Sequence, residues 1–313
     1  MARTNSGGGL DVTGLPIGVV ARDLGLSQDL LRKWETRYGF PEPGRNTHGE
    51  RVYPQAQVDR LRLIKRLLDA GLRPAHVVPQ GDAALRALIN ELAPPSLPAE
   101  DGPIKPMFDL LREHDVPALE ARMQAELLRG GLEAFVRDVA IPMTEAVGRA
   151  WSQGELDVFE EHIYTEAIGR LLRNGIAEVS HARGRPRVVL TTLPDERHGL
   201  GLLFVAAMLS QRGARCLSLG TEMPIPEIAR VVRVMHADIV GLSFSSVYPH
   251  RLIGATLREL RGQLGEGPEI WAGGGGVANL QHSVRLRGVR LFTSIDDAQV
   301  ALTRWCEAQA QGL

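Results

Sequence analysis

From residue 186 onward, short apolar runs alternate with longer segments of helical period. The runs are rich in Val, Ile and Leu and are bounded by Gly or Pro, which is typical of buried strands. Strands and helices that alternate in this way predict a parallel, doubly wound sheet. The strands are expected at residues 187–193, 215–219, 238–244, 269–273 and 289–293, with helices between them and a last helix at 295–309.

The segment between residues 104 and 179 keeps a helical period throughout. The period breaks near 115–117, at 130–131 and at Gly154, where Pro or Gly interrupts it. About four helices remain, and short connections between them predict a small helical bundle.

Two short helices with a tight turn between them are predicted near the N-terminus. The first covers residues 17–25, and the second covers 28–38 with Ser27 as a favoured N-cap. This arrangement is typical of a helix-turn-helix. A hairpin-like loop at 40–53 and a helix at 55–70 are expected to follow.

These patterns together predict a multidomain protein of the α and α/β classes. It would combine a helix-turn-helix domain, a four-helix bundle and a doubly wound parallel-sheet domain. We place these domains at residues 15–82, 104–182 and 186–313. Residues 83–103 are assigned to a linker, because the chain is rich in proline around 94–103.

Charge, cysteine content and apolar runs limit the possible partners, metal sites and location of the protein. The 313 residues carry a formal net charge of -1, but residues 16–80 hold eleven Lys and Arg against seven Asp and Glu. Nucleic acid is therefore a possible partner of the N-terminal domain alone. The two cysteines, Cys216 and Cys306, form neither a zinc spacing nor a disulfide framework. Because there is no apolar signal core and no membrane-spanning run, we expect a cytoplasmic protein without a membrane partner.

One histidine lies in the loop that follows the first strand of the predicted sheet. Ligands of open α/β sheets gather at this end of the strands. Glu196 precedes His198 by two residues and could accept a hydrogen bond from one ring nitrogen, which would orient the ring toward a metal. The alternative is a loop histidine whose neighbours Gly199 and Gly201 serve only the turn. This segment alone does not decide between the two.

The Glu-x-His-x-x-Gly segment resembles the Asp-x-His-x-x-Gly signature of cobalamin-binding modules of the methionine-synthase type. The resemblance implies that His198 is the lower cobalt ligand and that Glu196 supports it, with glutamate in place of the family's aspartate. It also implies that Gly201 lets the cofactor approach the backbone.

Two later segments resemble further signatures of the same modules. Ser243 and Ser245 follow the third predicted strand, and Gly273 and Gly274 follow the fourth. The resemblance implies that these residues line a slot for the nucleotide tail of the cofactor. The third position of the serine motif is atypical.

The N-terminal segment resembles the winged-helix DNA-binding domain of MerR-family regulators. The resemblance is carried by Leu-Arg-Lys-Trp-Glu-Thr-Arg-Tyr-Gly at 31–39, followed by Pro43, Arg45, Gly49, Arg51 and Tyr53. It implies that Arg32 and Arg37 contact double-stranded operator DNA from the second helix. Arg45 and Arg51 would contact it from the wing. Trp34 and Tyr38 are expected to support the core and the wing.

The bundle carries the pattern Trp-x9-Glu-His, formed by Trp151, Glu161 and His162. It resembles a motif of light-responsive, cobalamin-dependent MerR regulators. The resemblance implies that these three residues cover the upper face of adenosylcobalamin. A histidine that directly follows the tryptophan in that group is replaced by Ser152.

The favoured hypothesis is a transcription regulator, with repression as the expected effect, that is controlled by adenosylcobalamin and light. The resemblance implies that cofactor-bound protomers form a homo-oligomer, a dimer or tetramer, on DNA. A light-independent cobalamin sensor is the first alternative, suggested by Ser152. A corrinoid methyl carrier is the second, although a carrier has no use for a winged helix. No catalytic acid–base pair or nucleophile is found, so we expect no enzymatic activity.

Overall fold

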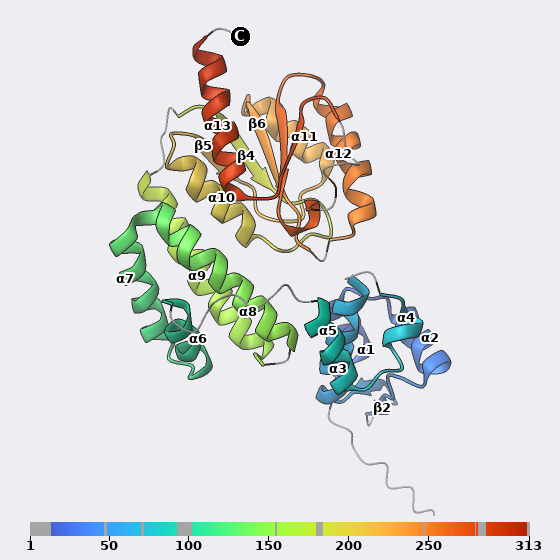
Figure 1. Ribbon diagram of the computed structural model, residues 1–313. Coiled ribbons are helices and arrows are strands. Elements are labelled where there is room, and N and C mark those ends of the chain that lie inside the picture. The colour runs from blue at the N-terminus through green and yellow to red at the C-terminus, as the bar shows by residue number, and fades with distance from the viewer. Residues whose placement is uncertain are drawn as a thin grey trace, which may run out of the picture. The chain divides into compact units, whose positions relative to one another are not determined.

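The computed structural model describes residues 14–46, 49–69, 72–92, 102–153, 155–179, 184–246, 248–278, 280 and 286–311. The chain divides into two compact units. The first contains the elements up to α5, and the second contains the elements from α6 onward (Figure 1).

The N-terminal unit is a helix-turn-helix with a small antiparallel sheet. Ser27 caps α2 by accepting a hydrogen bond from the Leu30 amide, and Gly39 ends this helix with a φ of 70°. Among the described residues, three strands pair in the order β1-β3-β2. The elements are β1 Leu15–Pro16, α1 Ile17–Leu24, α2 Gln28–Tyr38, β2 Gly44–Arg45, β3 Arg51–Tyr53, α3 Gln55–Asp69, α4 Pro74–Val77 and α5 Asp82–Leu92.

The core of this unit collects the apolar faces of the helices and of β3. Trp34 from α2 and Tyr53 from β3 are buried together with Leu61 and Ile64 of α3. Tyr38 is half-buried and packs against the same cluster. The expectation that Trp34 lies in the core is confirmed.

The assignment of residues 83–103 to a linker is wrong for its first part. Residues 82–92 form the helix α5, whose Leu85 and Ile89 are buried in the core of the N-terminal unit. These two side chains stand four residues apart, so they lie on one face of the helix, and this face packs on α3. The N-terminal unit therefore extends to α5. The segment from 93 to 101 lies outside the described residues.

The second unit begins with a bundle of helices. The turn expected near 115–117 falls between α6 and α7, and Gly131 interrupts α7 with a φ of 74° and a ψ of 172°. Directly after α7 the chain makes one wide π-helical turn, η1, before α8. The elements are α6 Ile104–Arg112, α7 Val116–Phe135, η1 Val136–Ala140, α8 Ile141–Gln153 and α9 Val158–Val179.

A parallel sheet follows, as predicted. Among the described residues its five strands take the order β5-β4-β6-β7-β8. Each expected strand is present, but four of the five end one or two residues earlier than predicted. The elements are β4 Arg187–Thr191, α10 Leu200–Ser210, β5 Arg215–Ser218, α11 Ile225–Val234, β6 Ile239–Ser243, α12 His250–Leu264, β7 Glu269–Gly273, η2 Gly275–Val277, β8 Val289–Phe292 and α13 Ile295–Ala310.

Helix α10 joins the bundle to the sheet. It is apolar on all sides, which is typical of a helix buried on every face. Phe204 and Met208 enter the core of the bundle, whereas Leu202 and Leu209 enter the core beneath the sheet. The bundle and the sheet therefore share one helix, and His198 stands two residues before this helix begins.

Polar contacts at the other end of α10 also connect the bundle and the sheet. Arg137 of η1 donates to Glu133 of α7 at 3.2 Å and to Asp296 of α13 at 2.9 Å. Gln299 of α13 donates to Glu133 at 3.3 Å, and Arg212, just after α10, lies 3.5 Å from the same oxygen.

Glu133 is expected to make the stability of this unit depend on pH. Burial opposes ionisation of Glu133, but hydrogen bonds from Gln299 and Arg137 outweigh burial and hold its pKa below the usual value. Ionised Glu133 therefore stabilises the fold above the unfolded pKa of about 4.3, and this contribution is lost as the pH falls through the folded pKa.

Urea unfolding of Glu133→Gln between pH 7 and pH 3 measures this contribution. The variant should be less stable than the natural protein at pH 7, and the difference should shrink below about pH 4. The same change at Glu113, an exposed residue, serves as the control. A difference for Glu133→Gln that stays constant across this range would contradict the assignment.

No helix among the described residues is long and apolar enough to span a membrane.

Candidate cofactor site and nucleic-acid interface

The strand order places a ligand site at the carboxyl ends of β4 and β6. These strands are neighbours, with Thr191 opposite Leu242. After β4 the chain continues to β5 on one side of this pair, and after β6 it continues to β7 on the other side. In open α/β sheets, ligands bind in the crevice at such a switch point. The loop with Glu196 and His198 follows β4, and Ser243 and Ser245 lie at the end of β6.

Glu196 ties these two loops together. One carboxylate oxygen lies 2.6 Å from His198 Nδ1 and also accepts the His198 amide proton at 3.0 Å. The other oxygen accepts from the amide and the hydroxyl of Ser245, at 2.7 and 2.8 Å. Glu196 is 1% exposed, whereas the His198 side chain is 63% exposed. A buried carboxylate therefore orients an accessible imidazole.

The electrostatics of Glu196 follow from these contacts. Burial opposes its ionisation, but the hydrogen bonds from His198 and Ser245 outweigh burial and hold the pKa of Glu196 below its usual value. The carboxylate is thus charged at neutral pH and favours a proton on His198 Nδ1. Nε2, the ring nitrogen that Glu196 does not contact, is then the atom suited to bind a metal.

Thr192 supports the loop, and sequence reasoning missed it. It is fully buried, and its hydroxyl donates to the backbone carbonyl of Glu196. The same hydroxyl accepts from the Glu222 amide at 2.9 Å, in the loop after β5. Thr192 thus fixes the backbone from which Glu196 extends. Threonine directly after a strand is too common a feature to have indicated this role.

The glycines of the expected cofactor slot have different surroundings. A Cβ at Gly201 would lie 2.6 Å from Ser243 Oγ, so this glycine lets Ser243 pack against the start of α10. Gly274 has a φ of 96°, and a Cβ there would lie 2.4 Å from the Phe244 carbonyl oxygen. A Cβ at Gly273 would make only an ordinary contact, at 3.5 Å from the Phe292 carbonyl oxygen. Gly201 and Gly274 are thus required by contacts within the protein.

The residues expected above the cofactor lie at one end of the bundle, where α8 ends and α9 begins. Trp151 in the last turn of α8 is 37% exposed. Glu161 in the first turn of α9 lies 2.8 Å from His162 Nδ1 and accepts from the Thr165 hydroxyl at 2.7 Å. An accessible indole and an imidazole that is held by a carboxylate are both available there to a ligand.

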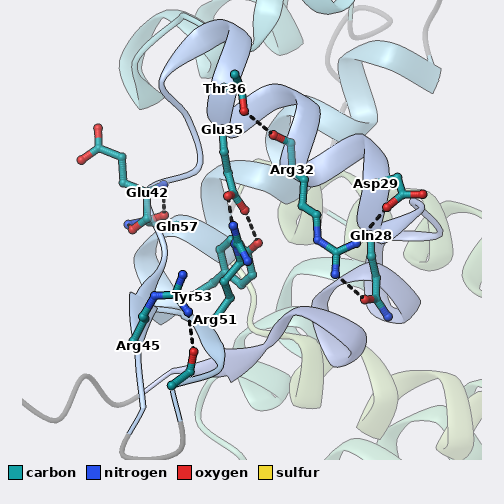
Figure 2. Close-up of polar contacts among 11 residues, drawn as sticks. Gln28, Asp29, Arg32, Glu35, Thr36, Glu42, Arg45, Arg51, Tyr53 and Gln57 are labelled. Carbon is teal, nitrogen blue, oxygen red and sulfur yellow. Dashed lines mark hydrogen bonds and ion pairs between the residues drawn. The ribbon is translucent and has the colours of Figure 1, made fainter.

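The four arginines expected to contact DNA differ in the groups that they contact; Figure 2 shows Arg32, Arg45 and Arg51. Arg32 donates to Asp29 at 2.8 Å on the exposed face of α2. Arg37 is exposed on the same helix, and its guanidinium lies 5.4 Å from the Tyr38 ring centre. Arg45 on β2 is exposed and donates to the Gly49 carbonyl. Arg51 on β3 instead points toward Glu35 and donates to it at 3.1 Å.

Comparison with known proteins identifies the family of the N-terminal unit and that of the helical bundle. The family of MerR HTH regulatory proteins matches residues 15–78, and the B12 binding domain matches residues 104–174. The HTH-type transcriptional repressor CarH of Myxococcus xanthus is 30% identical over 290 residues, which cover 90% of this chain and 95% of CarH. The chain belongs to the MerR family of regulators that carry a B12-binding domain.

Two further similarities concern the family and the fold of this MerR-type regulator, respectively. The HTH-type transcriptional repressor CarA of Myxococcus xanthus is 28% identical, and the match covers 74% of this chain and 76% of CarA. The monomethylamine corrinoid protein of Methanosarcina barkeri superposes with a TM-score of 0.50 at 14% identity, covering 64% of this chain and 97% of that chain. The second similarity shows the fold alone and confirms the predicted helical and doubly wound parallel-sheet classes.

Proposed function

We propose that this MerR-type regulator is a transcriptional repressor whose DNA binding is controlled by adenosylcobalamin and light. The network of Glu196, His198 and Ser245 carries the proposal, because it presents an oriented imidazole at the sheet edge where ligands of this fold bind. The relatives CarH and CarA are named as transcriptional repressors, which supports repression as the effect.

The chemistry of the site fits a cobalt corrinoid. In the proposal, His198 Nε2 is the lower cobalt ligand, and Glu196 keeps the ring in place as carboxylates do for metal-bound histidines. Glutamate serves here as aspartate does in the resembling modules, because its longer side chain still reaches both His198 and Ser245.

The nucleotide tail is proposed to lie along the ends of β6 and β7. Ser243 and Gly273 would line its slot near the switch point, and Gly201 would leave room for Ser243 at the start of α10. Ser245 and Gly274 would act less directly, because Ser245 is bound to Glu196 and Gly274 packs against Phe244.

Control by light is proposed to act through the end of the bundle. Adenosylcobalamin, when bound, supplies a cobalt–carbon bond that light breaks. Trp151, Glu161 and His162 would contact the adenosyl group, so its loss would remove their partner and change how the bundle packs. A homo-oligomer, a dimer or tetramer, would then dissociate and lose the gain in affinity that several linked DNA-binding units provide.

A light-independent cobalamin sensor is the second candidate. Ser152 favours it, because the light-responsive group that the chain resembles has a histidine at this position. Such a sensor would use the same lower ligand and would respond to the presence of the cofactor rather than to illumination.

DNA binding in the dark and after illumination tests the proposal. The probe is a duplex that the full-length protein enriches from a random library in the dark with adenosylcobalamin. We expect green light to weaken binding at least about tenfold and to reduce the size of the complex in solution, because a dissociated protomer makes fewer phosphate contacts. Equal binding in dark and light, with cofactor still required, would favour the sensor. Binding that does not depend on cofactor would contradict both candidates.

A further inference from the structure

Glu35 connects the second helix of the helix-turn-helix to the wing. It extends from α2 toward β3, where one carboxylate oxygen accepts from Arg51 Nε at 3.1 Å. The other oxygen accepts from the Tyr53 hydroxyl at 2.6 Å (Figure 2). Arg51 and Tyr53 lie 16 and 18 residues further along the chain, so the contact joins two separate elements.

Glu35 and Tyr53 are sheltered from solvent, and Arg51 is half-buried. The side chain of Glu35 is 15% exposed and that of Arg51 is 36% exposed, while Tyr53 is fully buried. Burial raises the pKa of Tyr53, and its hydrogen bond to the Glu35 carboxylate raises it further, so the hydroxyl keeps its proton and remains a donor. Hydrogen bonds to an ionised carboxylate are among the stronger ones in proteins. Glu35 thus holds β3 firmly against α2.

The position of β3 determines the position of the rest of the wing. In the small sheet of the N-terminal unit, as far as it is described, β3 is the central strand and pairs with both β1 and β2. Arg45 on β2 stands opposite Arg51 in this register. Fixing β3 on α2 therefore fixes where Arg45 lies relative to Arg32 and Arg37.

A second pair of contacts holds the start of the wing, the hairpin-like segment at residues 40–53. The Glu42 amide donates to Gln57 at 2.8 Å, and the Gln57 amide group donates back to the Glu42 carbonyl at 2.7 Å. The wing is thus attached to α3 at its start and to α2 at its last strand, whereas Arg45 between these points is exposed.

We propose that Glu35 is a positioning residue for DNA binding, and that Arg51 serves it inside the protein rather than contacting a phosphate. The proposal rests on the DNA-binding function and revises the expectation that Arg51 is a wing contact. Arg45 and the exposed arginines of α2 remain the groups suited to contact DNA.

A double-mutant cycle with Glu35→Gln and Arg51→Met tests the proposal. DNA affinity of the full-length protein with adenosylcobalamin is measured in the dark, on a duplex enriched by the natural protein, over a series of salt concentrations. We expect each single variant to lose about tenfold in affinity and the double variant to lose no more than either one, because all three break the same ion pair. The slope of log affinity against log salt should not change, since the same phosphates remain neutralised.

A direct phosphate contact by Arg51 would give a different pattern. Arg51→Met would then lower the salt slope by about 0.9 for each phosphate that is no longer neutralised, as Arg37→Met is expected to do. Glu35→Gln would leave affinity unchanged or increase it, since it would free the Arg51 charge for DNA. Either result would overturn the proposal. Failure of the natural protein to enrich any duplex would instead contradict the DNA-binding function itself.

Two controls separate positioning from charge and from folding. Glu50→Gln removes the same charge from the wing without touching Glu35, because Glu50 is exposed and its hydrogen bonds among the described residues go to Asn46. It should leave affinity and salt slope nearly unchanged. Tyr53→Phe removes one hydroxyl and keeps the buried ring. It should weaken binding less than Glu35→Gln, with the same salt slope. Thermal unfolding verifies that each variant is folded.

Discussion

His198→Ala is expected to lower the affinity for adenosylcobalamin by at least about 100-fold. Loss of an outer partner of a metal ligand costs about 10- to 100-fold, and loss of the ligand itself should cost no less. The fold should tolerate the change, because the His198 side chain is 63% exposed. Titration of the purified variant with the cofactor, followed by absorption in the dark, gives the affinity.

Arg197→Ala is the matched control for this prediction. Arg197 lies in the same loop as His198 and is exposed. It forms an ion pair with Glu222, which lies in the loop after β5 and not in the loop that contains Ser245. Its removal should change cofactor affinity little. A His198→Ala variant that binds the cofactor as tightly as Arg197→Ala would rule out His198 as the lower ligand.

Gly274→Ala is expected to destabilise the second unit by about 4 kcal/mol. The backbone conformation alone should cost about 1–3 kcal/mol for any residue but glycine, and the clash of the new Cβ with the Phe244 carbonyl adds to it. Displacement of Phe244 would also move Ser245, which bonds to Glu196. Cofactor affinity should therefore fall as well.

Gly265→Ala separates the clash from the backbone strain. Gly265 has a φ of 68° and a ψ of −148°, in the same glycine region, but a Cβ there meets no atom within 4 Å. Urea unfolding should show Gly274→Ala to be less stable than Gly265→Ala by about 2 kcal/mol. Equal destabilisation would mean that the loop after β6 moves aside without cost.

Much of the fold followed from the sequence, because its signals are local. Ser27 and Gly39 mark the ends of α2, and the structure places this helix at the predicted residues. The ends of the strands were less accurate, because apolar residues such as Leu193 continue past β4 into a buried loop. Helix α5 was missed because it directly precedes the proline-rich segment, and only packing on α3 shows that it belongs to the N-terminal unit.

The site residues show where a sequence pattern stops being informative. Glu196 and His198 are two residues apart, so their contact could be anticipated, and the structure contains it. Ser245 lies 49 residues from Glu196, and its bond to that carboxylate depends on the neighbouring positions of β4 and β6. Arg51 is a basic residue in the predicted wing, so the sequence suggested a DNA contact. Its pairing with Glu35 depends on how β3 packs against α2, which the sequence does not reveal.

The central claim, that His198 holds a cobalt corrinoid, is tested most directly by isotope labelling. The protein is produced with ¹⁵N-histidine and loaded with unlabelled cobalamin in its paramagnetic Co(II) form. The electron paramagnetic resonance signal is split by the nucleus of the axial nitrogen. We expect the doublet of ¹⁵N, and we expect it to disappear in His198→Ala. A triplet from ¹⁴N would mean that the cofactor's own base binds cobalt, and a signal without nitrogen splitting would mean that no histidine does. Either result would contradict the account.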